Sequence, residues 1–195
     1  MTSDEVLNRF KQTGALLEGH FRLSSGLHSA VYLQCAIALQ NTADAGDFGA
    51  ALADHFRDGQ IETVASPAIG GLVIGYEVAR QLGVRFIWTE RDQGTMTLRR
   101  GFTIRPAERI LVVEDVITTG GSTRDTIAVL CAAGANVVAA GSVIDRSGGA
   151  ADVGVPRVSL ATLQVVAISS DQCEACRRGE LVVKPGSRTS APGTK

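Results

Sequence analysis

Residues Ile110 to Thr123 read ILVVEDVITTGGST. The first four residues are apolar, which is typical of a β-strand buried on both faces of a parallel sheet. Two adjacent carboxylates, Glu114 and Asp115, follow this run. A turn rich in hydroxyl groups and glycine comes next, and it leads into a predicted helix. The stretch therefore predicts a strand, a tight turn and a helix, with an acidic pair where the strand ends.

The turn after the acidic pair predicts a phosphate site. Gly120 and Gly121 allow the backbone to turn with its N–H groups facing inward, and Ser122 or Thr123 can cap the helix that follows. A helix N-terminus adds partial positive charge. Carboxylates next to a phosphate repel it unless they bind sugar hydroxyls or a metal ion. The combination predicts a phosphorylated sugar; the alternative is a capped strand–helix turn that is acidic by chance.

Helix and strand patterns alternate on both sides of this stretch. Helices are expected over 44–57, 71–82 and 122–133, and strands over 61–66, 84–89 and 136–144. Strands separated by helices of about a dozen residues indicate βαβ units and a parallel sheet of about five strands. Ligands of such sheets bind beyond the carboxyl ends of the strands.

The N-terminal residues predict a small appendage to this sheet. Thr2 and Glu5 have capping-box spacing ahead of an apolar helical face. Alternating apolar residues on either side of the turn at 24–26 then predict an antiparallel hairpin. We divide the chain into a helix and hairpin segment (1–40), a core (41–183) that includes a C-terminal C-x-x-C, and a flexible tail (184–195) rich in Pro, Gly, Ser and Thr.

Composition narrows the function classes. The chain has 195 residues, 45% of them apolar, with 19 Lys and Arg against 20 Asp and Glu. A balance this close, without runs of like charge, argues against a nucleic-acid partner. The first five residues are polar and acidic, unlike a secretory signal, and the apolar runs are too short to span a membrane. We expect a soluble, cytoplasmic protein.

The acidic pair followed by TTGGST is neither a dinucleotide-binding nor a P-loop motif. It resembles the phosphoribosyl pyrophosphate motif of the type I phosphoribosyltransferases. That resemblance implies an α/β fold, in which a parallel sheet is flanked by helices and carries a small N-terminal hood.

Three more segments extend the resemblance over nearly the whole chain. Residues 66–71 (SPAIGG) resemble the family's pyrophosphate loop, which often holds a non-proline cis peptide, here expected at Ala68–Ile69. Taken alone, this loop is also compatible with a plain Gly-rich turn. Residues 20–26 (HFRLSSG) resemble the hood of the orotate phosphoribosyltransferases, and 145–149 (DRSGG) resemble the segment whose arginine faces orotate. A guanidinium suits a planar base that bears a carboxylate, whereas a surface ion pair is the alternative for Arg146.

The resemblance implies a role for each matching residue. The reaction would transfer phosphoribose from phosphoribosyl pyrophosphate to orotate, giving orotidine monophosphate and pyrophosphate, with Mg²⁺ as cofactor and a homodimer as the assembly. Catalysis would rest on Asp115, Glu114 and Arg91, and no side chain of the protein is expected to ligate a resident metal. Contacts to phosphoribosyl pyrophosphate would come from Glu114, Asp115, Val116, Ile117, Thr118, Thr119, Gly120, Gly121, Ser122, Ala68, Ile69 and Gly70, and contacts to orotate from Thr118 and Arg146.

The sequence departs from the family pattern in its cations. Residues 90–100 match the family's mobile loop but contain neither Lys nor His, and Gly70 and Ser24 stand where many members have Lys. Arg91, Arg99, Arg100 and Mg²⁺ are the available substitutes, with Arg91 or Arg99 reaching across the dimer, as in a shorter-loop branch with a cysteine pair near the C-terminus. Two rival functions stay open: a purine phosphoribosyltransferase, and a non-catalytic regulator that binds phosphoribosyl pyrophosphate.

The cysteines and histidines suggest no further site. Cys35 and Cys131 lie in apolar surroundings and are expected to be core thiols. Cys173 and Cys176 form a single C-x-x-C, which supplies only two of the four ligands that a structural zinc needs. We expect reduced structural thiols there, with a zinc shared across a dimer or a redox pair as alternatives. None of His20, His28 and His55 has a metal-ligand partner at useful spacing.

Overall fold

The computed structural model describes residues 1–23 and 25–185. Helix α1 (Ser3–Gln12) leads into the hairpin β1 (Leu16–Arg22) and β2 (His28–Leu33), followed by α2 (Cys35–Leu39) and α3 (Thr42–Asp54). The sheet region comprises β3 (Thr63–Pro67), α4 (Gly71–Leu82), β4 (Arg85–Asp92), β5 (Thr95–Leu98), β6 (Arg109–Ile117), α5 (Gly121–Ala132), β7 (Asn136–Asp145) and β8 (Arg157–Thr162). The chain then returns to the hairpin and forms α6 (Glu174–Arg177). Two 3₁₀ turns, Arg57–Gly59 and Ser170–Gln172, complete the described elements.

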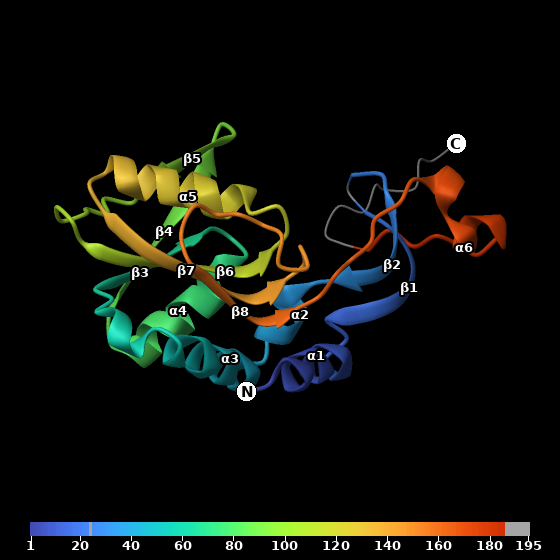
Figure 1. The fold of residues 1–195 in the computed structure, drawn as a ribbon, viewed down its shortest axis with the longest axis horizontal. Coiled ribbons are helices and arrows are strands. Elements are labelled where there is room, and N and C mark those ends of the chain that lie inside the picture. The colour runs from blue at the N-terminus through green and yellow to red at the C-terminus, as the bar shows by residue number, and fades with distance from the viewer. Residues whose placement is uncertain (24, 186–195) are drawn as a thin grey trace.

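One six-stranded sheet organises the main body, in the order β5-β4-β3-β6-β7-β8. The five strands β4, β3, β6, β7 and β8 are parallel, as expected, and β5 adds an antiparallel edge. Helices α3 and α4 cover one face and α5 the other (Figure 1). Buried apolar side chains form a separate cluster on each face, which explains why the central strands are apolar throughout.

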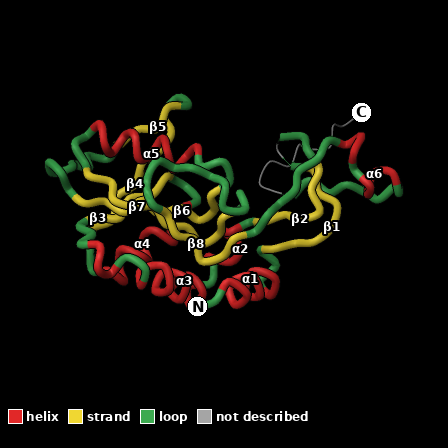
Figure 2. The backbone as a smooth tube through the Cα atoms, viewed as in Figure 1, coloured by secondary structure: helices red, strands yellow, loops and turns green. Residues whose placement is uncertain are grey.

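The N-terminal prediction is confirmed. Thr2 caps α1 and its hydroxyl accepts from the Glu5 amide, while the Glu5 carboxylate accepts from the Thr2 amide. The predicted hairpin is β1–β2, although Ser24 in its turn lies outside the described residues. Figure 2 shows that the chain after β8 runs back along this hairpin. We call β1, β2 and residues 164–183 the hood lobe.

The hood lobe is joined by main-chain hydrogen bonds. Ile168 exchanges two backbone hydrogen bonds with His28, at 2.7 and 2.9 Å. The amide of Val183 donates to the carbonyl of His20, and the amide of Arg22 donates to the carbonyl of Val183, both at 2.8 Å. The C-x-x-C segment, which we had grouped with the core, therefore pairs with the hairpin. The last ten residues of the predicted flexible tail, 186–195, lie outside the described residues.

Residues 90–100, which match the family's mobile loop, are largely a regular hairpin in the structure. They form most of the hairpin β4–β5, with Gln93 and Gly94 at φ 48° and 87° in its two-residue turn. Such a turn needs positive φ at both central positions, and Gly94 adopts it without strain. Strand β8 and helix α2 were not predicted, and Cys131 is exposed, so its assignment as a core thiol was wrong. Within the described residues, no helix combines the length and apolar character needed to cross a bilayer.

Candidate active site

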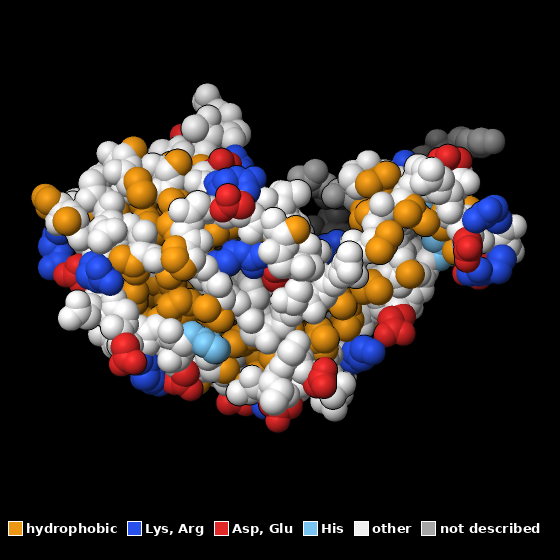
Figure 3. Space-filling view, viewed as in Figure 1, with side chains coloured by type: hydrophobic (Ala, Val, Ile, Leu, Met, Phe, Trp, Pro, Cys, Tyr) orange, Lys and Arg blue, Asp and Glu red, His pale blue; other side chains and the backbone are white. Residues whose placement is uncertain are grey.

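The candidate site lies where β3 and β6 end side by side. These two parallel strands pair from Thr63 with Ile110 to Ala65 with Val112, so their carboxyl ends lie at one edge of the sheet. The chain leaves β3 toward β4 on one side and leaves β6 toward β7 on the other. This is the topological switch point of the sheet, where the connections diverge and leave a crevice. In Figure 3 the surface is hollowed between the main body and the hood lobe.

The acidic pair stands at this edge without a cation of the described residues beside it. Glu114 is buried, at 7% exposure, and Asp115 is half-buried. Burial, and then the adjacent negative charge of Asp115, raise the pKa of Glu114 to about 9. Burial also raises the pKa of Asp115 above its ordinary value. Among the described residues, neither carboxylate has an ion pair with Lys, Arg or His, so the pair is suited to a ligand that brings hydroxyl donors or a cation.

The turn that follows the acidic pair forms the predicted cradle. Gly120 has φ 76°, and the hydroxyl-bearing residues Thr118, Thr119 and Ser122 are exposed. The expectation that Ser122 or Thr123 caps α5 was wrong, because Gly120 is the N-cap and no side chain caps the helix. The first-turn N–H groups are therefore left for a ligand, as an anion site at a helix N-terminus requires. The Arg124 guanidinium braces the turn by donating to the carbonyl of Thr119 at 2.8 Å.

The loop after β3 faces the acidic pair. The peptide bond between Ala68 and Ile69 is cis, as predicted. A Cβ added to Gly70 would lie 2.7 Å from Oδ1 of Asp115, and one added to Gly71 would lie 3.3 Å from Oε1 of Glu114. Helix α4 also starts without a side-chain cap. Helices α4 and α5 follow the neighbouring strands β3 and β6, so their N-termini lie at the same edge of the sheet. Together the two N-termini can hold two phosphate groups.

Arg146 follows β7 and lies close to the same edge. Its amide donates to the carbonyl of Ile117 at 2.8 Å, and its Nε is buried without a hydrogen-bond partner. Burial lowers the pKa of Arg146, and the nearest opposing influences come from Cys35 and Tyr32. The surface ion pair that was the alternative is not what the described residues show. A buried guanidinium nitrogen without a partner costs free energy unless a ligand accepts from it.

Asp145 holds the Arg146 segment in place and does not face a ligand. Its carboxylate accepts from the amide and hydroxyl of Ser147, at 2.7 and 2.6 Å, and from Nη1 of Arg157 at 2.8 Å. Although burial alone would raise it, these hydrogen bonds from Ser147 and the Arg157 guanidinium hold the pKa of Asp145 below its ordinary value. The function of Asp145 is therefore to order the turn that presents Arg146.

Sequence reasoning missed Cys35 and Tyr32 as neighbours of the site. Cys35 is buried, which confirms its assignment as a core thiol. Burial, and then the charges of Asp115 and Glu114, raise the pKa of its thiol well above the ordinary range. Cys35 therefore lies between the acidic pair and Arg146 as a neutral group. The local sequence around either residue gives no signal of this, because the contact joins β2 and α2 to the sheet edge.

The three arginines near the shortened loop are held by carboxylates of the same chain. Nη2 of Arg91 donates to Asp125 at 2.7 Å and its Nη1 to the carbonyl of Gly94 at 2.9 Å. Arg100 makes two hydrogen bonds to Glu90, and Arg99 lies 3.4 Å from Asp92. Arg91 is therefore exposed and is held near the first turns of α5 by its contacts with Asp125 and Gly94.

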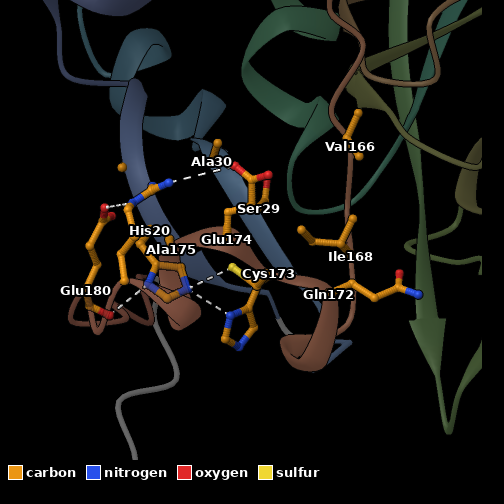
Figure 4. Close-up of a pocket in the computed structure, with 13 residues that line it drawn as sticks. His20, Ser29, Ala30, Val166, Ile168, Gln172, Cys173, Glu174, Ala175 and Glu180 are labelled. Atoms are coloured by element: carbon orange, nitrogen blue, oxygen red, sulfur yellow. Dashed lines mark hydrogen bonds and ion pairs between the residues drawn. The ribbon is translucent and has the colours of Figure 1, made fainter.

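Two histidines and two cysteines meet in the hood lobe, away from the sheet edge. His20, His28, Cys173 and Cys176 have ligand atoms that all lie within 4.8 Å of one another. The expectation that His20 and His28 lack metal-ligand partners was wrong, because the partners come from a segment about 150 residues further along the chain. A cavity of about 470 Å³ lies beside this cluster and is lined by β1, β2 and the C-terminal segment (Figure 4).

Comparison with known proteins places these observations in a wider context. The family model described as phosphoribosyl transferase domain matches residues 39–169. A protein of Pelotomaculum thermopropionicum named orotate phosphoribosyltransferase is 50% identical over 188 residues, covering 96% of this chain and 99% of its own. One of the same name from Chlorobaculum parvum is 50% identical and covers 99% of this chain and 100% of its own. The crystal structure of orotate phosphoribosyltransferase from Aeropyrum pernix matches with a TM-score of 0.66 at 29% identity, covering 82% of this chain and 94% of that one.

Proposed function

We infer the chemistry of this site from one premise: the chain belongs to the phosphoribosyltransferase family and, within it, to the orotate phosphoribosyltransferases. The reaction is transfer of phosphoribose from phosphoribosyl pyrophosphate to orotate. A ring nitrogen of orotate loses its proton to solvent and forms a bond to the anomeric carbon. The bond from that carbon to the pyrophosphate oxygen breaks, and pyrophosphate leaves with the electron pair. The products are orotidine monophosphate and pyrophosphate.

The observation that carries the choice of base is the side chain of Arg146, which is half-buried and has a fully buried Nε. Its Nε has no partner among the described residues, and the segment that bears it is fixed by Asp145. A planar base with a carboxylate can accept from such a guanidinium in a bidentate arrangement. A purine base without a carboxylate offers no charge to compensate it. Thr118, exposed at the end of β6, supplies a hydroxyl on the same side.

The sugar and its phosphates fit the groups at the ends of β3 and β6. In the proposed complex the 5-phosphate lies on the turn 118–122 at the N-terminus of α5, and the pyrophosphate lies against Ala68, Ile69 and Gly70 at the start of α4. Glu114 and Asp115 accept from the ribose hydroxyls. The backbone of Val116 and Ile117 carries these side chains into position. Positive charge develops on the ribose in an oxocarbenium-like transition state, and the two carboxylates stabilise it there.

The proposed cofactor is Mg²⁺, and the donor set is compatible with it. Two carboxylates lie together with raised pKa values, and no cation of the described chain is paired with them. Hard oxygen donors of this kind are what Mg²⁺ prefers. Glu114 and Asp115 would hold the ion through the sugar hydroxyls or water. When bound, Mg²⁺ neutralises charge on the pyrophosphate oxygens as they leave.

We propose a homodimer in which Arg91 of one chain reaches the site of the other. Its support is chemical: residues 90–100 contain no lysine, and leaving pyrophosphate needs a cation in addition to the metal. Arg91 is exposed, and its ion pair with Asp125 lies at the surface. Such a pair contributes little stability, so Arg91 can leave Asp125 for a more strongly charged anion at little cost in free energy. We also propose the cytoplasm as the compartment, because all four cysteines are free thiols in the structure.

The test is loss of orotate absorbance after purified protein is mixed with phosphoribosyl pyrophosphate and Mg²⁺, with uracil, hypoxanthine and adenine as parallel bases. Consumption of orotate alone is the expected result. Consumption of a purine would show that the proposed specificity for orotate is wrong. No consumption of any base, together with calorimetric binding of phosphoribosyl pyrophosphate, would instead favour a non-catalytic regulator.

A further inference from the structure

The four converging side chains of the hood lobe come from three places in the chain. His20 lies on β1, His28 begins β2, Cys173 is the N-cap of α6, and Cys176 lies within α6. Nε2 of His20 lies 3.4 Å from Sγ of Cys173 and 3.5 Å from Sγ of Cys176, while Nδ1 of His28 lies 3.2 Å from Sγ of Cys176. Figure 4 shows the His20 ring pointing at Cys173 from across the hairpin.

These spacings are close to those around a tetrahedral zinc ion. Zinc bonds of about 2.0–2.1 Å to nitrogen and about 2.3 Å to sulfur place neighbouring ligand atoms about 3.3–3.8 Å apart. Two of the three nitrogen–sulfur distances, 3.4 and 3.5 Å, lie within that range, and the third, 3.2 Å, lies just below it. The two histidine nitrogens, 2.8 Å apart, are closer and need to separate by about half an ångström. Side-chain rotation alone accommodates a change of that size.

Hydrogen bonding without a metal leaves the cluster short of acceptors. Nδ1 of His20 lies 3.0 Å from the carbonyl oxygen of Glu180, which can only accept, so Nδ1 carries the proton. In the neutral ring Nε2 then offers a single lone pair. Three groups lie around that lone pair: Nδ1 of His28 and the sulfurs of Cys173 and Cys176. If Nδ1 of His28 donates to that lone pair, neither thiol can donate to it, and if Nδ1 of His28 is itself an acceptor, two lone pairs face each other at 2.8 Å. One cation bound between the four atoms removes both conflicts.

The contact to Glu180 also matches how metal-bound histidines are held. A ligating histidine almost always donates its other ring N–H to a carbonyl or carboxylate, which fixes the tautomer and orients the ring. The Glu180 carbonyl does this for His20. The same contact comes from the C-terminal segment, just after α6, so the segment that supplies the cysteines also orients the histidine.

Apart from the main-chain hydrogen bonds at Ile168 and Val183, the C-terminal segment buries little apolar surface that could hold it to the hairpin. From residue 163 to 183, Cys173 is the only buried residue among those described, and Leu181 is 91% exposed. A segment without an apolar core of its own commonly depends on a metal or a disulfide. Cys173 and Cys176 belong to one turn, so a disulfide between them would not join the segment to the hairpin.

We propose that His20, His28, Cys173 and Cys176 bind one structural Zn²⁺ that fastens the C-terminal segment to the β1–β2 hairpin. Two thiolates and two imidazoles in a tetrahedral set favour zinc. Four protein ligands close the coordination shell, so the ion has no open position for substrate and serves the fold of the hood lobe. This site is separate from the Glu114–Asp115 edge and stands whether or not the proposed function holds.

The first experiment measures zinc in protein purified without chelators, by inductively coupled plasma mass spectrometry. The expected content is about one zinc per chain. Cys176→Ser is the informative variant because Cys176 is only half-buried, and it should lose most of the zinc. Cys131→Ser is the matched control, since Cys131 is an exposed free thiol far from the cluster, and it should keep a full complement.

A second measurement protects the test against a variant that fails to fold. Wild-type protein is stripped of metal with a chelator under reducing conditions and titrated with Co²⁺. Thiolate-to-cobalt charge-transfer bands and intense tetrahedral d–d bands are expected, and Zn²⁺ should abolish both. Limited proteolysis of the stripped protein should cut within residues 163–183 while the sheet body stays intact, and Zn²⁺ should restore protection.

The outcomes separate cleanly. Wild-type protein with negligible zinc, and no tetrahedral cobalt spectrum after reduction, would overturn the proposal. A Cys173–Cys176 disulfide found by mass spectrometry in freshly purified protein that was kept under reducing buffer would do the same. Equal zinc loss in Cys131→Ser and Cys176→Ser would show that the metal is bound elsewhere. None of these readouts depends on transferase activity.

Discussion

Gly70 and Asp115 approach so closely that a Cβ on Gly70 would lie 2.7 Å from Oδ1 of Asp115. The loop after β3 and the acidic pair on β6 are therefore fitted to one another at the sheet edge. Any side chain at Gly70 should act on chemistry through Asp115.

Gly70→Ala should lower kcat/KM by about tenfold or more, because a misplacement of the carboxylate by a few tenths of an ångström disturbs a preorganised site. The backbone at Gly70, with φ −56°, accepts alanine without strain, so the melting temperature should change little. Steady-state kinetics and thermal denaturation measure the two effects. Gly46→Ala, whose new Cβ would meet only atoms at 3.8 Å or more, is the control and should keep full activity. Unchanged kinetics in Gly70→Ala would remove the proposed coupling to Asp115.

Glu114→Gln should flatten the pH dependence of stability in the ligand-free protein. The pKa of Glu114 is raised from 4.5 to about 9, so the folded state binds its proton more tightly than the unfolded state between these values. The free energy of unfolding is therefore greatest below the unfolded pKa and falls as pH rises toward the folded pKa, by at most about 1.4 kcal/mol per pH unit for one group.

Urea denaturation of ligand-free protein across that pH window measures this slope. The wild-type midpoint should fall steeply with pH, and Glu114→Gln should show a smaller slope because Asp115 then lies beside a neutral amide. Phosphoribosyl pyrophosphate with Mg²⁺ should reduce the wild-type slope as well, since the carboxylates then bind ligand in their charged form. Identical slopes in wild type and Glu114→Gln would contradict the buried, proton-retaining carboxylate.

Arg146→Ala should raise the KM for orotate by about tenfold to a hundredfold while binding of phosphoribosyl pyrophosphate stays nearly intact, because one charge-assisted hydrogen bond pair is lost. Initial-rate kinetics and calorimetry separate the two substrates. Arg57→Ala, which removes an exposed arginine paired with Asp54 on the far side of the sheet, is the control. Equal loss of sugar-phosphate binding in Arg146→Ala would mean that Arg146 is misassigned.

Arg91→Ala and Asp115→Asn should each inactivate the homodimer, and a mixture of the two should recover activity if Arg91 acts in the partner's site. In a mixed dimer one site has an intact Asp115 from one chain and an intact Arg91 from the other. Activity is measured after the two inactive proteins exchange subunits. Absence of recovery, despite exchange shown by native mass spectrometry, would place Arg91 in its own chain's site or outside catalysis.

Local sequence determined much of the fold and of the sugar-phosphate site. The motif 110–123 keeps its chemistry within a few residues, because a buried strand, a glycine turn and a helix start are each set by neighbouring side chains. The helix and strand periodicities of the sheet body, the α1 capping box and the Ala68–Ile69 bond were predicted for the same reason. The edges of the sheet were less predictable, because the pairing of β8 and of the β4–β5 hairpin depends on which strand is left unpaired in the folded sheet.

Contacts between distant parts of the chain could be found only in the folded structure. The apolar sequence neighbours of Cys35 predicted a core thiol. Packing of α2 against the sheet also places this thiol beside Asp115 and Arg146. A C-x-x-C and two unremarkable histidines, separated by more than 140 residues, form one four-atom cluster because the C-terminal segment pairs with the hairpin. Spacing along the chain predicts contacts only within a turn or a strand pair. The pairing of residues 168 and 183 with β2 and β1 arises only in the folded chain. It brings together the two histidines and the two cysteines of the proposed zinc site.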